Sequence, residues 1–564
     1  MSTQTHIPKT IAGLLLVTAV SVTASDLPSN WIPQVAPLKE YRSIGGSGNN
    51  LNPRLNPVPY NPELSLTPLN FKPGPGNQLV DAPNARYISN QISGATGADG
   101  TELGQVTDPV ISAWMYVFGQ FLDHDIDLEE TPQTNAYIPI SIATGDPVFK
   151  DGGTIAMYRD TRSMRTNTII NTTAGYLDLS QLYGSDATTA ASLRNADGTL
   201  KTSYSGTALP LDPTGQYFIT GDPRVMENPE LTAVTILFMR EHNFWVTTLK
   251  NQHPNWNGDQ LYNMAKAITT AEYQNIVYKE FLPALIGPST LGPYRGYDPS
   301  VNPQATQEFS TAAFRVGHSQ VSDTQEGIDN SGNVLFSQAL SDAFFNTAAI
   351  DMNPPHGIDP LLRSLGVDFS QATDPYVVGA LRNLLVAGLV GGGEDKIDLI
   401  AIDIQRQRDV GLGTLNQTRK ALGMQPYTSY GALTSDSKLQ ANLKIVYGQN
   451  GIDNVDLFIG GLAEKHAQGA IVGPTFQAII ADQFQALRAG DRLFWLNEGF
   501  DQATSWMIAN TTLAKLLQRN AATPNLQANV FIQADIPPHV RHHATAPTII
   551  NGSGRQNPFT HDGI

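Results

Sequence analysis

Apolar residues recur at helical spacing over most of the chain from residue 107 onward. Apolar residues three and four positions apart lie on one face of a helix. This spacing holds for Val110, Ile111, Trp114, Val117, Phe118, Phe121 and Leu122. Asp108 and Pro109 fit the cap and first position of this helix, and Asn228 and Pro229 fit those of a second one. Further helices are predicted over 258–285, 309–320, 376–390, 415–422, 436–447, 459–465, 474–488 and 502–518.

Strand-like alternation is scarce, so the pattern predicts a mainly α fold with little β structure. Composition does not change enough over residues 107–520 to mark a boundary, which predicts a single large helical domain. Residues 25–106, rich in proline, asparagine and glycine, predict an extended segment that wraps this domain, and residues 521–564 a C-terminal tail. Long helices that enclose a cavity are a common setting for a bound cofactor.

The N-terminus has the pattern of a signal peptide over residues 1–24. Lys9 precedes an apolar run from Ile11 to Val22 that is too short to span a bilayer, and the small residues Ala24 and Ser25 mark a cleavage site. An N-terminal membrane anchor is the alternative. The later chain has no apolar run of about 18 residues, so we expect a secreted or periplasmic protein without a membrane span after cleavage.

Composition excludes several kinds of site and partner. The 564-residue chain has no cysteine, which excludes disulfides, thiolate zinc sites, thiolate nucleophiles and iron–sulfur clusters. A net charge of −16 argues against a nucleic-acid partner, because such a protein needs a basic surface to displace counterions. Stability must then come from the core, to which bound ions or cofactors can add.

The stretch GQFLDHDIDLEE (119–130) follows directly on the first apolar pattern. Gln120 and His124 are four apart and share one helix face, which Asp123 borders, while Asp125 points away from it. A buried histidine beside an amide can act as a general acid and base, because its unperturbed pKa lies near neutrality. The alternative is a solvated acidic helix end. For Asp127, Glu129 and Glu130 we keep this interpretation.

Two further stretches place an arginine beside a potential ligand or acid. In GDPRVMENPE (221–230), Arg224 and Glu227 lie in a turn before the second helix. This arginine is either a fixed positive charge where negative charge develops on oxygen, or half of a structural ion pair. In AAFRVGHSQV (312–321), Arg315 and His318 lie on a predicted helix. The histidine is either a metal ligand through Nε2 or a satisfied core residue.

A fourth stretch, AGYLDLSQLYGS (174–185), has Tyr176, Asp178 and Ser180 at alternate positions. In an extended loop, alternate residues can direct carbonyl, carboxylate and hydroxyl oxygens at one point, and such hard ligands suit Ca²⁺. An ordinary turn held by aspartate and serine side chains is the alternative.

Together and in this order, these stretches resemble the animal-type haem peroxidases of the peroxidase–cyclooxygenase superfamily, the myeloperoxidase and lactoperoxidase type. Four more segments extend the resemblance over about residues 40–520: EYRSIGGSGNN (40–50), GIDP (357–360), IQRQRD (404–409) and GDRLFWLNEG (490–499). The resemblance implies a secreted enzyme that reduces hydrogen peroxide through a ferryl haem and oxidises small phenolic, halide or pseudohalide reductants. The missing cysteines suit an exported bacterial homologue.

The resemblance also implies a role for each candidate residue. His124 matches the distal histidine above a haem b, with Gln120 beside it, Arg224 matches the distal arginine, and His318 matches the proximal iron ligand. The carboxylates that form ester bonds to haem methyl groups are matched by Asp123 and Glu227. Arg315 and Asp403 match the surroundings of the proximal histidine. The family's calcium site is matched by Asp125, Ala174, Tyr176, Asp178 and Ser180.

The chain departs from the family pattern at four places. Asp403 stands where the partner of the proximal histidine is usually an asparagine. A carboxylate there gives His318 imidazolate character and lowers the iron potential, which argues against chloride oxidation. Asn228 replaces the methionine that myeloperoxidase links to a haem vinyl group, and Ala174 replaces a threonine of the calcium loop. RDVG (408–411) replaces the usual RDHG, with no physical account of its effect.

Two other functions are alternatives to an active peroxidase. Fatty-acid dioxygenases of the superfamily have a radical-forming tyrosine three residues before the proximal histidine, and Arg315 stands at that position here. A matrix or adhesion protein would use the haem-bearing scaffold without turnover. Retention of Gln120, His124, Arg224 and His318 counts against such a loss of activity.

Overall fold

The computed structural model describes residues 31–533 except for 74–76, 78, 95–106, 345, 347–349, 351–356 and 388–393. Helices account for 43% of the structure and strands for 10%, without a barrel, so the mainly α prediction is confirmed. The predicted signal peptide and the end of the predicted tail lie outside the described residues. None of the described helices combines the length and hydropathy that a membrane crossing requires.

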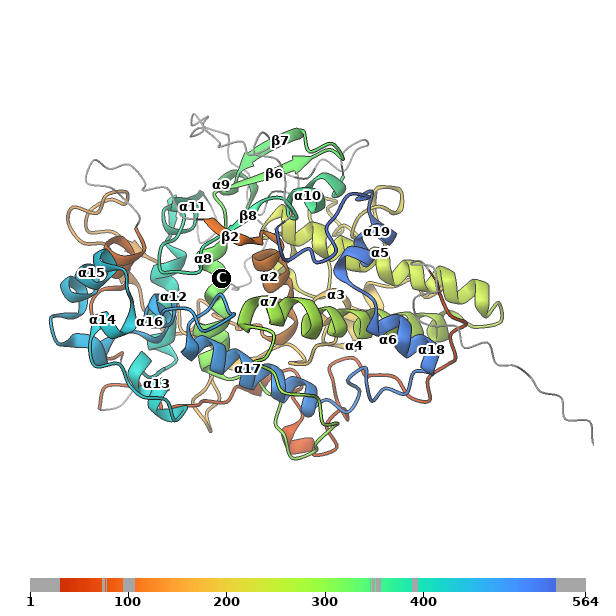
Figure 1. The fold of residues 1–564 in the computed structure, drawn as a ribbon, viewed down its shortest axis with the longest axis horizontal. Helices are drawn as coiled ribbons and strands as arrows, with labels where there is room; N and C mark the ends of the chain where they lie inside the picture. Colours follow the sequence, from red (N-terminus) through yellow and green to blue (C-terminus); the bar gives the residue numbers. More distant parts are fainter. Residues whose placement is uncertain are drawn as a thin grey trace, which may run out of the picture.

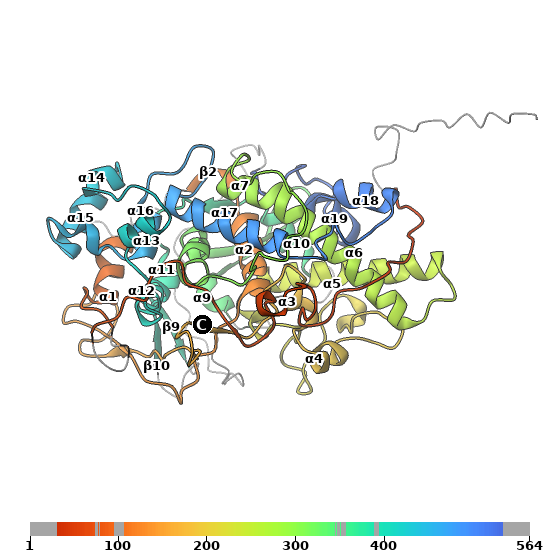
Figure 2. The ribbon, with the colours of Figure 1, turned by 90° about the horizontal axis from the view of Figure 1, so that it is seen from below.

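One helix lies at the centre of the molecule, and the others are arranged around it (Figures 1 and 2). This helix, α2 (Trp114–Ile126), packs on α5 (Pro229–Gln252) and on α8 (Gly317–Gln320). Beside α5 runs α6 (Gly258–Ile276), which continues through the π-turn η6 (Val277–Phe281) into α7 (Leu282–Ile286). The turns η7 (Phe309–Ala313) and η8 (Phe314–Val316) lead into α8.

Two groups of helices flank this centre on opposite sides (Figures 1 and 2). On one side, α18 (Gln502–Ala509) and α19 (Leu513–Asn520) pack on α6 and α5. The other side holds α12 (Leu399–Asp409), α13 (Leu415–Ala421), α14 (Tyr430–Leu433), α15 (Ser437–Tyr447) and α16 (Leu457–Ala463). Between the two groups, α17 (Pro474–Ala489) packs on α7 and η7.

The remaining elements are short. In the described residues the strands form five antiparallel pairs: β1 (Asn61–Pro62) with β5 (Ile170–Asn171), β2 (Thr107–Ser112) with β8 (Phe369–Gln371), β3 (Ile140–Ser141) with β4 (Thr154–Ile155), β6 (Thr324–Ile328) with β7 (Val334–Ala339), and β9 (Leu384–Ala387) with β10 (Glu394–Ile397). The short helices are η2 (Pro53–Leu55), α1 (Ala85–Ile88), η3 (Ser89–Ser93), α3 (Ser180–Tyr183), α4 (Ala187–Ser192), η4 (Tyr204–Gly206), η5 (Pro223–Met226), α9 (Leu340–Ala343), α10 (Asp359–Ser364), α11 (Gly379–Arg382) and η10 (Gly451–Asn454).

The first predicted helix begins later than the sequence pattern suggested. Residues 107–112 form β2 and pair with β8, and the helix starts at Trp114. Asp108 does accept hydrogen bonds from the backbone N–H groups of Val110 and Ile111, as a helix cap would. This local turn is compatible with a helix start or with a strand. The backbone pairing with β8 makes residues 107–112 a strand.

Three other helix predictions need correction. The interval 376–390 contains only α11, after which the apolar run continues as β9 against β10, so a helix there is wrong. The interval 502–518 is interrupted, because Thr512 caps a new helix by accepting from Lys515 N–H. α12 was not predicted. Its charged positions, such as Arg406 and Asp409, are buried with the apolar ones, so its sequence lacks a polar face.

The described residues between 31 and 94 run along the length of the helical body with only short elements (Figure 2). One anchor is Asp491, which accepts hydrogen bonds from Arg42 Nη2 at 2.9 Å and from Asn49 Nδ2 at 2.7 Å. At the other end of the chain, Val530 and Phe531 are fully buried. The packed structure therefore includes part of residues 521–564, the segment that the sequence pattern assigned to a tail.

A cluster of aromatic rings joins α2 to its neighbours. Phe118 of α2 is fully buried, and its ring centroid lies 5.3–6.5 Å from those of Phe121, Phe238, Tyr273, Phe281 and Phe531. Rings at these separations pack edge to face or tilted, which adds to the gain from burial. The cluster ties α2 to α5, α6 and η6 through a single side chain.

Replacing Phe118 with alanine should destabilise the protein by about 3–5 kcal/mol, because the change leaves a cavity among packed rings. Thermal or denaturant unfolding measures the loss. Ile445→Ala is the control, since Ile445 is 60% exposed on α15 and its change should stay within about 0.5 kcal/mol. Equal losses in the two variants would show that the ring cluster is not a main source of stability.

Candidate active site

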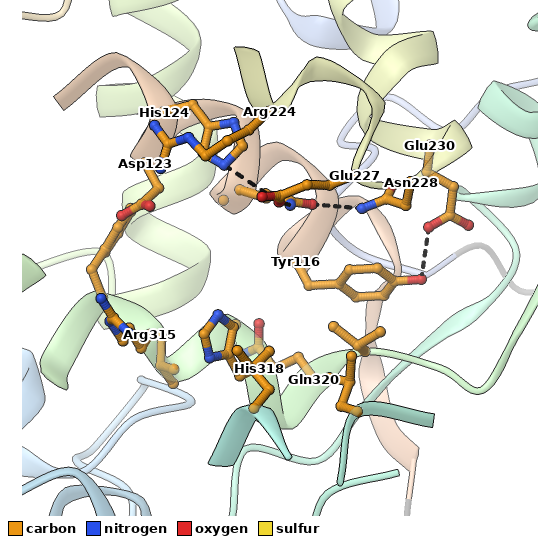
Figure 3. Close-up of a pocket in the computed structure, with 18 of the residues that line it drawn as sticks. Tyr116, Asp123, His124, Arg224, Glu227, Asn228, Glu230, Arg315, His318 and Gln320 are labelled. Atoms are coloured by element: carbon orange, nitrogen blue, oxygen red, sulfur yellow. Dashed lines mark hydrogen bonds and ion pairs between the residues drawn. The ribbon is translucent and has the colours of Figure 1, made fainter. Parts of the chain in front are cut away.

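The residues of α2 at every fourth position face a cavity in the centre of the molecule. Tyr116, Gln120 and His124 line it, together with Asp123 (Figure 3). The cavity holds about 1430 Å³ of space free of protein atoms, part of it open to solvent. Its lining combines apolar side chains such as Phe281 and Phe314 with a few polar groups, as ligand and cofactor pockets commonly do.

The start of α5 fixes the amide of Gln120. Asn228 caps α5 by accepting from Leu231 N–H, as predicted, and its Nδ2 donates to Gln120 Oε1 at 2.8 Å. Gln120 Nε2 in turn donates to Glu227 Oε2 at 2.7 Å. Both ends of the amide are therefore occupied, and its orientation is fixed by the two partners.

His124 is buried in the wall of the cavity and makes no hydrogen bond to the described residues. Its Nε2 lies 3.8 Å from Glu227 Oε2, and its Nδ1 lies 3.9 Å from Asp222 Oδ1. Burial and the neighbouring Arg224 lower the pKa of His124 to about 3. The imidazole is therefore neutral at neutral pH and free to accept a proton.

Arg224 is held beside His124 by a carboxylate that the sequence reading missed. Asp222 accepts from Arg224 Nε at 3.0 Å and from Nη2 at 2.7 Å, and the Asp127 carbonyl accepts from Nη2 at 2.8 Å. Burial alone would raise the pKa of Asp222, but Arg224 and His124 outweigh it and keep the pKa low. The result is a buried ion pair with fixed geometry at the cavity wall.

Two carboxyl groups of the same wall have raised pKa values. Burial raises the pKa of Glu227 to about 8, although Arg224 opposes the change. Burial also raises the pKa of Asp123 to about 6, against the effect of Arg224, Arg315 and His318. Both groups are therefore poorly solvated carboxyls next to the cavity.

The opposite wall carries His318 on α8 (Figure 3). Its Nδ1 donates to Asp403 Oδ2 at 2.7 Å, which leaves Nε2 as the nitrogen available to a ligand. Arg315 Nη1 donates to the other carboxylate oxygen of Asp403 at 2.8 Å, and Arg315 Nη2 bonds Glu129 at 3.3 Å. Burial would raise the pKa of Asp403, but His318 and Arg315 lower it, so the group is an anion.

Part of the acidic end of GQFLDHDIDLEE is not solvated. Asp127 is only 5% exposed, and burial together with Asp123, Glu63 and Glu129 raises its pKa well above the usual value. Glu129 is ion-paired with Arg315. Glu130 alone is exposed, as expected. The interpretation fails for Asp127 because α2 ends inside the molecule rather than at its surface.

Asp125 points away from the cavity, as its place on the helix predicted. Its carboxylate accepts from the backbone N–H groups of Leu179 and Ser180 at 3.0 and 2.6 Å, and from Ser180 Oγ at 2.8 Å. Leu179 has a φ of 60°, a left-handed conformation at the start of α3. Two successive amides thereby bind one buried carboxylate, in the manner of an anion-binding nest.

The other residues of the proposed ion site surround this contact. Ala174, Tyr176 and Asp178 are buried, and Asp178 Oδ1 makes no hydrogen bond to the described residues. Burial and Asp178 raise the pKa of Asp125 to about 7. Across the described part of the chain, no three His, Asp or Glu side chains converge as metal ligands. The site offers two carboxylates and otherwise neutral oxygens.

Sequence reasoning missed Tyr116, Asp222 and Glu230, all beside the cavity or its arginine. Each of the three had a signal in the sequence. Tyr116 lies four residues before Gln120 on the same helix face. Glu230 lies at the second position of α5, where a carboxylate is favoured by the helix dipole. Asp222 caps η5 by accepting from Arg224 N–H, a local pattern readable from its spacing.

A helical body with one cavity between two histidines, one neutral beside an arginine and one bonded to a carboxylate, is the architecture of a haem enzyme. The sequence profile of the animal haem peroxidases matches residues 41–531. Peroxinectin A of Dictyostelium discoideum is 31% identical, with 87% of this chain and 96% of that protein covered. Human myeloperoxidase is 30% identical over 92% of this chain and 77% of its own.

Solved structures show the same fold. Peroxidase A from Dictyostelium discoideum matches with a TM-score of 0.78 and 28% identity over 87% of this chain and 99% of that one. The Arabidopsis thaliana fatty acid alpha-dioxygenase matches with a TM-score of 0.73 but 18% identity, over 91% of this chain and 88% of that one. The chain belongs to the animal haem peroxidase family and is a haem peroxidase.

Replacing Glu227 with glutamine should change how stability depends on pH. An unfolded glutamate ionises near pH 4.5, and folded Glu227 near 8, so the wild-type fold loses stability as pH rises between these values. The variant, which has no ionisable group at this position, does not lose stability in this way. Its stability relative to wild type should increase across that window and stay constant outside it.

Thermal unfolding of the haem-free proteins at several pH values measures the difference. Glu130→Gln, at an exposed position, should give a curve parallel to wild type. A parallel curve for Glu227→Gln as well would contradict the raised pKa of Glu227.

Proposed function

We propose that this peroxidase is secreted, holds haem b between His124 and His318, and oxidises small phenolic, halide or pseudohalide reductants with hydrogen peroxide. The observation that carries the proposal is the pair of histidines on opposite walls of one cavity, each with different partners. The engaged Nδ1 of His318 leaves Nε2 for an axial bond. The apolar lining, which includes Phe281, Leu285 and Phe314, suits a flat aromatic macrocycle.

Haem, when bound, supplies an iron that accepts an oxygen atom from hydrogen peroxide and passes two oxidising equivalents on to reductants. His124 would take the proton from one peroxide oxygen and return it to the departing oxygen. Its lowered pKa supports this role, because the ring is unprotonated at neutral pH. Arg224, fixed by Asp222, would stabilise the negative charge that develops as the oxygen–oxygen bond lengthens. Gln120 would order the distal wall through Glu227 and Asn228.

The proximal wall would tune the iron through Asp403. A carboxylate acceptor increases the donor strength of His318 and lowers the iron potential. Arg315 shares the same carboxylate, so His318 receives less of its charge than from an unshared aspartate. Because the shared carboxylate still lowers the iron potential, we place phenols, iodide and thiocyanate ahead of chloride as reductants.

Asp123 and Glu227 are the proposed attachment points for haem methyl groups. Both carboxyls are buried beside the cavity, where an ester would remove a poorly solvated charge. Asn228 cannot form the third linkage of myeloperoxidase, and its side chain is already bonded to Gln120.

Ca²⁺ is the proposed occupant of the loop beside Asp125, with oxygens from Ala174, Tyr176, Asp178 and Ser180. The unbonded Oδ1 of Asp178 beside a second buried carboxylate supports a cation. The hydroxyl of Ser180 is already bonded to Asp125 and to Thr173, and only two carboxylates are present, so we propose weak binding.

Fatty-acid dioxygenation is not favoured by the site. Arg315 holds the position of the radical-forming tyrosine, and its guanidinium is bonded to Asp403 and Glu129. No observation in the structure favours an adhesion role over turnover.

Protein expressed with ample haem should show a Soret band and oxidise phenols with hydrogen peroxide. His124→Gln should slow the reaction with peroxide by roughly 10²–10⁴-fold, the usual contribution of a general acid–base residue. Stopped-flow absorbance measures the rate, and steady-state turnover with phenols and halides ranks the reductants. His253→Gln, outside the cavity, is the control. Absence of haem, or unchanged kinetics in His124→Gln, would refute the proposal.

Replacing Asp403 with asparagine should raise the iron reduction potential, because His318 loses an anionic acceptor but keeps a hydrogen-bond partner. Spectroelectrochemical titration gives the potential, and resonance Raman of the ferrous protein gives the iron–histidine stretch. The stretch should move to lower frequency. An unchanged potential and stretch would show that Arg315 already neutralises the effect of Asp403.

A further inference from the structure

Tyr116 occupies an edge of the cavity that the peroxidase reaction does not use. It lies at a level between the wall of Glu227 and Asn228 and the wall of His318 and Gln320 (Figure 3). Among the described residues that line the cavity, Tyr116 is the only tyrosine. It is 7% exposed, so its phenol is close to the cavity but shielded from bulk water.

The phenol is hydrogen-bonded to a buried carboxyl group. Tyr116 Oη donates to Glu230 Oε2 at 3.2 Å, and Glu230 is 2% exposed. Burial and the nearby Asp368 raise the pKa of Glu230 to about 8, although the hydrogen bond from Tyr116 opposes them. The carboxylate form of Glu230, whose share grows as the pH rises toward 8, is the base that lies directly on the phenolic O–H at the edge of the cofactor pocket.

Such a pair solves the main obstacle to oxidising a buried phenol. Loss of an electron alone would leave a positive charge in a poorly solvated site, which is costly. Transfer of the proton along an existing hydrogen bond keeps the phenol neutral and needs no other movement. Tyr262 is also buried, but its hydroxyl makes no hydrogen bond to the described residues, and it lies outside the cavity lining.

We propose that Tyr116 is a redox-active residue that stores one oxidising equivalent as a neutral tyrosyl radical, with Glu230 as its proton acceptor. The proposal rests on the peroxidase function above, which supplies the oxidant. Tyr116 gives one electron to the haem after its reaction with hydrogen peroxide. Its O–H bond breaks, and an O–H bond forms on Glu230 Oε2. A phenolic reductant then returns the electron, becoming a phenoxyl radical and releasing its own proton to solvent, and the proton on Glu230 goes back to Tyr116.

Rapid-freeze electron paramagnetic resonance tests the proposal on the haem-loaded full chain, mixed with hydrogen peroxide in the absence of reductant. Wild type should give a tyrosyl signal, identified by its narrowing when ring-deuterated tyrosine is incorporated. Tyr116→Phe should lose the signal, since it keeps the ring and removes only the hydroxyl. Tyr262→Phe is the matched control and should keep it.

A second variant keeps the test decisive if Tyr116→Phe binds haem poorly. Glu230→Gln leaves Tyr116 in place with a hydrogen-bond partner that cannot take the proton, so the radical yield should fall. A tyrosyl signal of unchanged yield and line shape in Tyr116→Phe or in Glu230→Gln overturns the inference. So does a wild-type enzyme with a Soret band and phenol turnover but no tyrosyl signal. If wild type shows no Soret band, the proposed function itself fails.

Discussion

The buried contact between Asp125 and the amides of Leu179 and Ser180 fixes the rotation of α2, and the active site depends on that rotation. A carboxylate without solvent must keep these hydrogen bonds, because losing them would leave a buried charge unpaired. With Asp125 turned to this side, His124 and Asp123 are turned toward the cavity. Phe118, seven residues before Asp125 and therefore on the same face of α2, packs in the aromatic cluster on the side away from the cavity. One short helix thus joins the core, a polar loop and the cavity.

Each histidine of the cavity is backed by an aspartate–arginine pair, and the distances support a different proposed role for each. Asp403 bonds His318 at 2.7 Å, which orients this ring and would make it a stronger donor toward the proposed iron. Asp222 lies 3.9 Å from His124, too far for a hydrogen bond, because its oxygens are taken by Arg224. This ring stays neutral and uncommitted, as proton transfer requires. Arg224 and Arg315 thus neutralise the buried carboxylates of Asp222 and Asp403, respectively. They thereby determine how strongly each carboxylate interacts with its histidine.

Much of the site could be predicted because short-range rules govern it. The spacing of Gln120, His124 and Asp125 on one helix determined their directions, and the cap at Asn228 determined where α5 begins. Prediction failed where contacts between distant segments determine the secondary structure or the burial of a residue. Residues 107–112 keep the cap-like turn of Asp108 but pair with β8. α12 is buried on all sides and so has no periodicity, and Asp127 is buried because α2 ends in the interior.

The most direct test of the account is the position of iron in crystals of the haem-loaded chain, located by anomalous diffraction at the iron edge. The account predicts one iron within bonding distance of His318 Nε2, with His124 and Arg224 on the other side of the macrocycle. It also predicts Tyr116 at the haem edge. Iron bound to another residue, or haem placed outside the cavity between the two histidines, would contradict it.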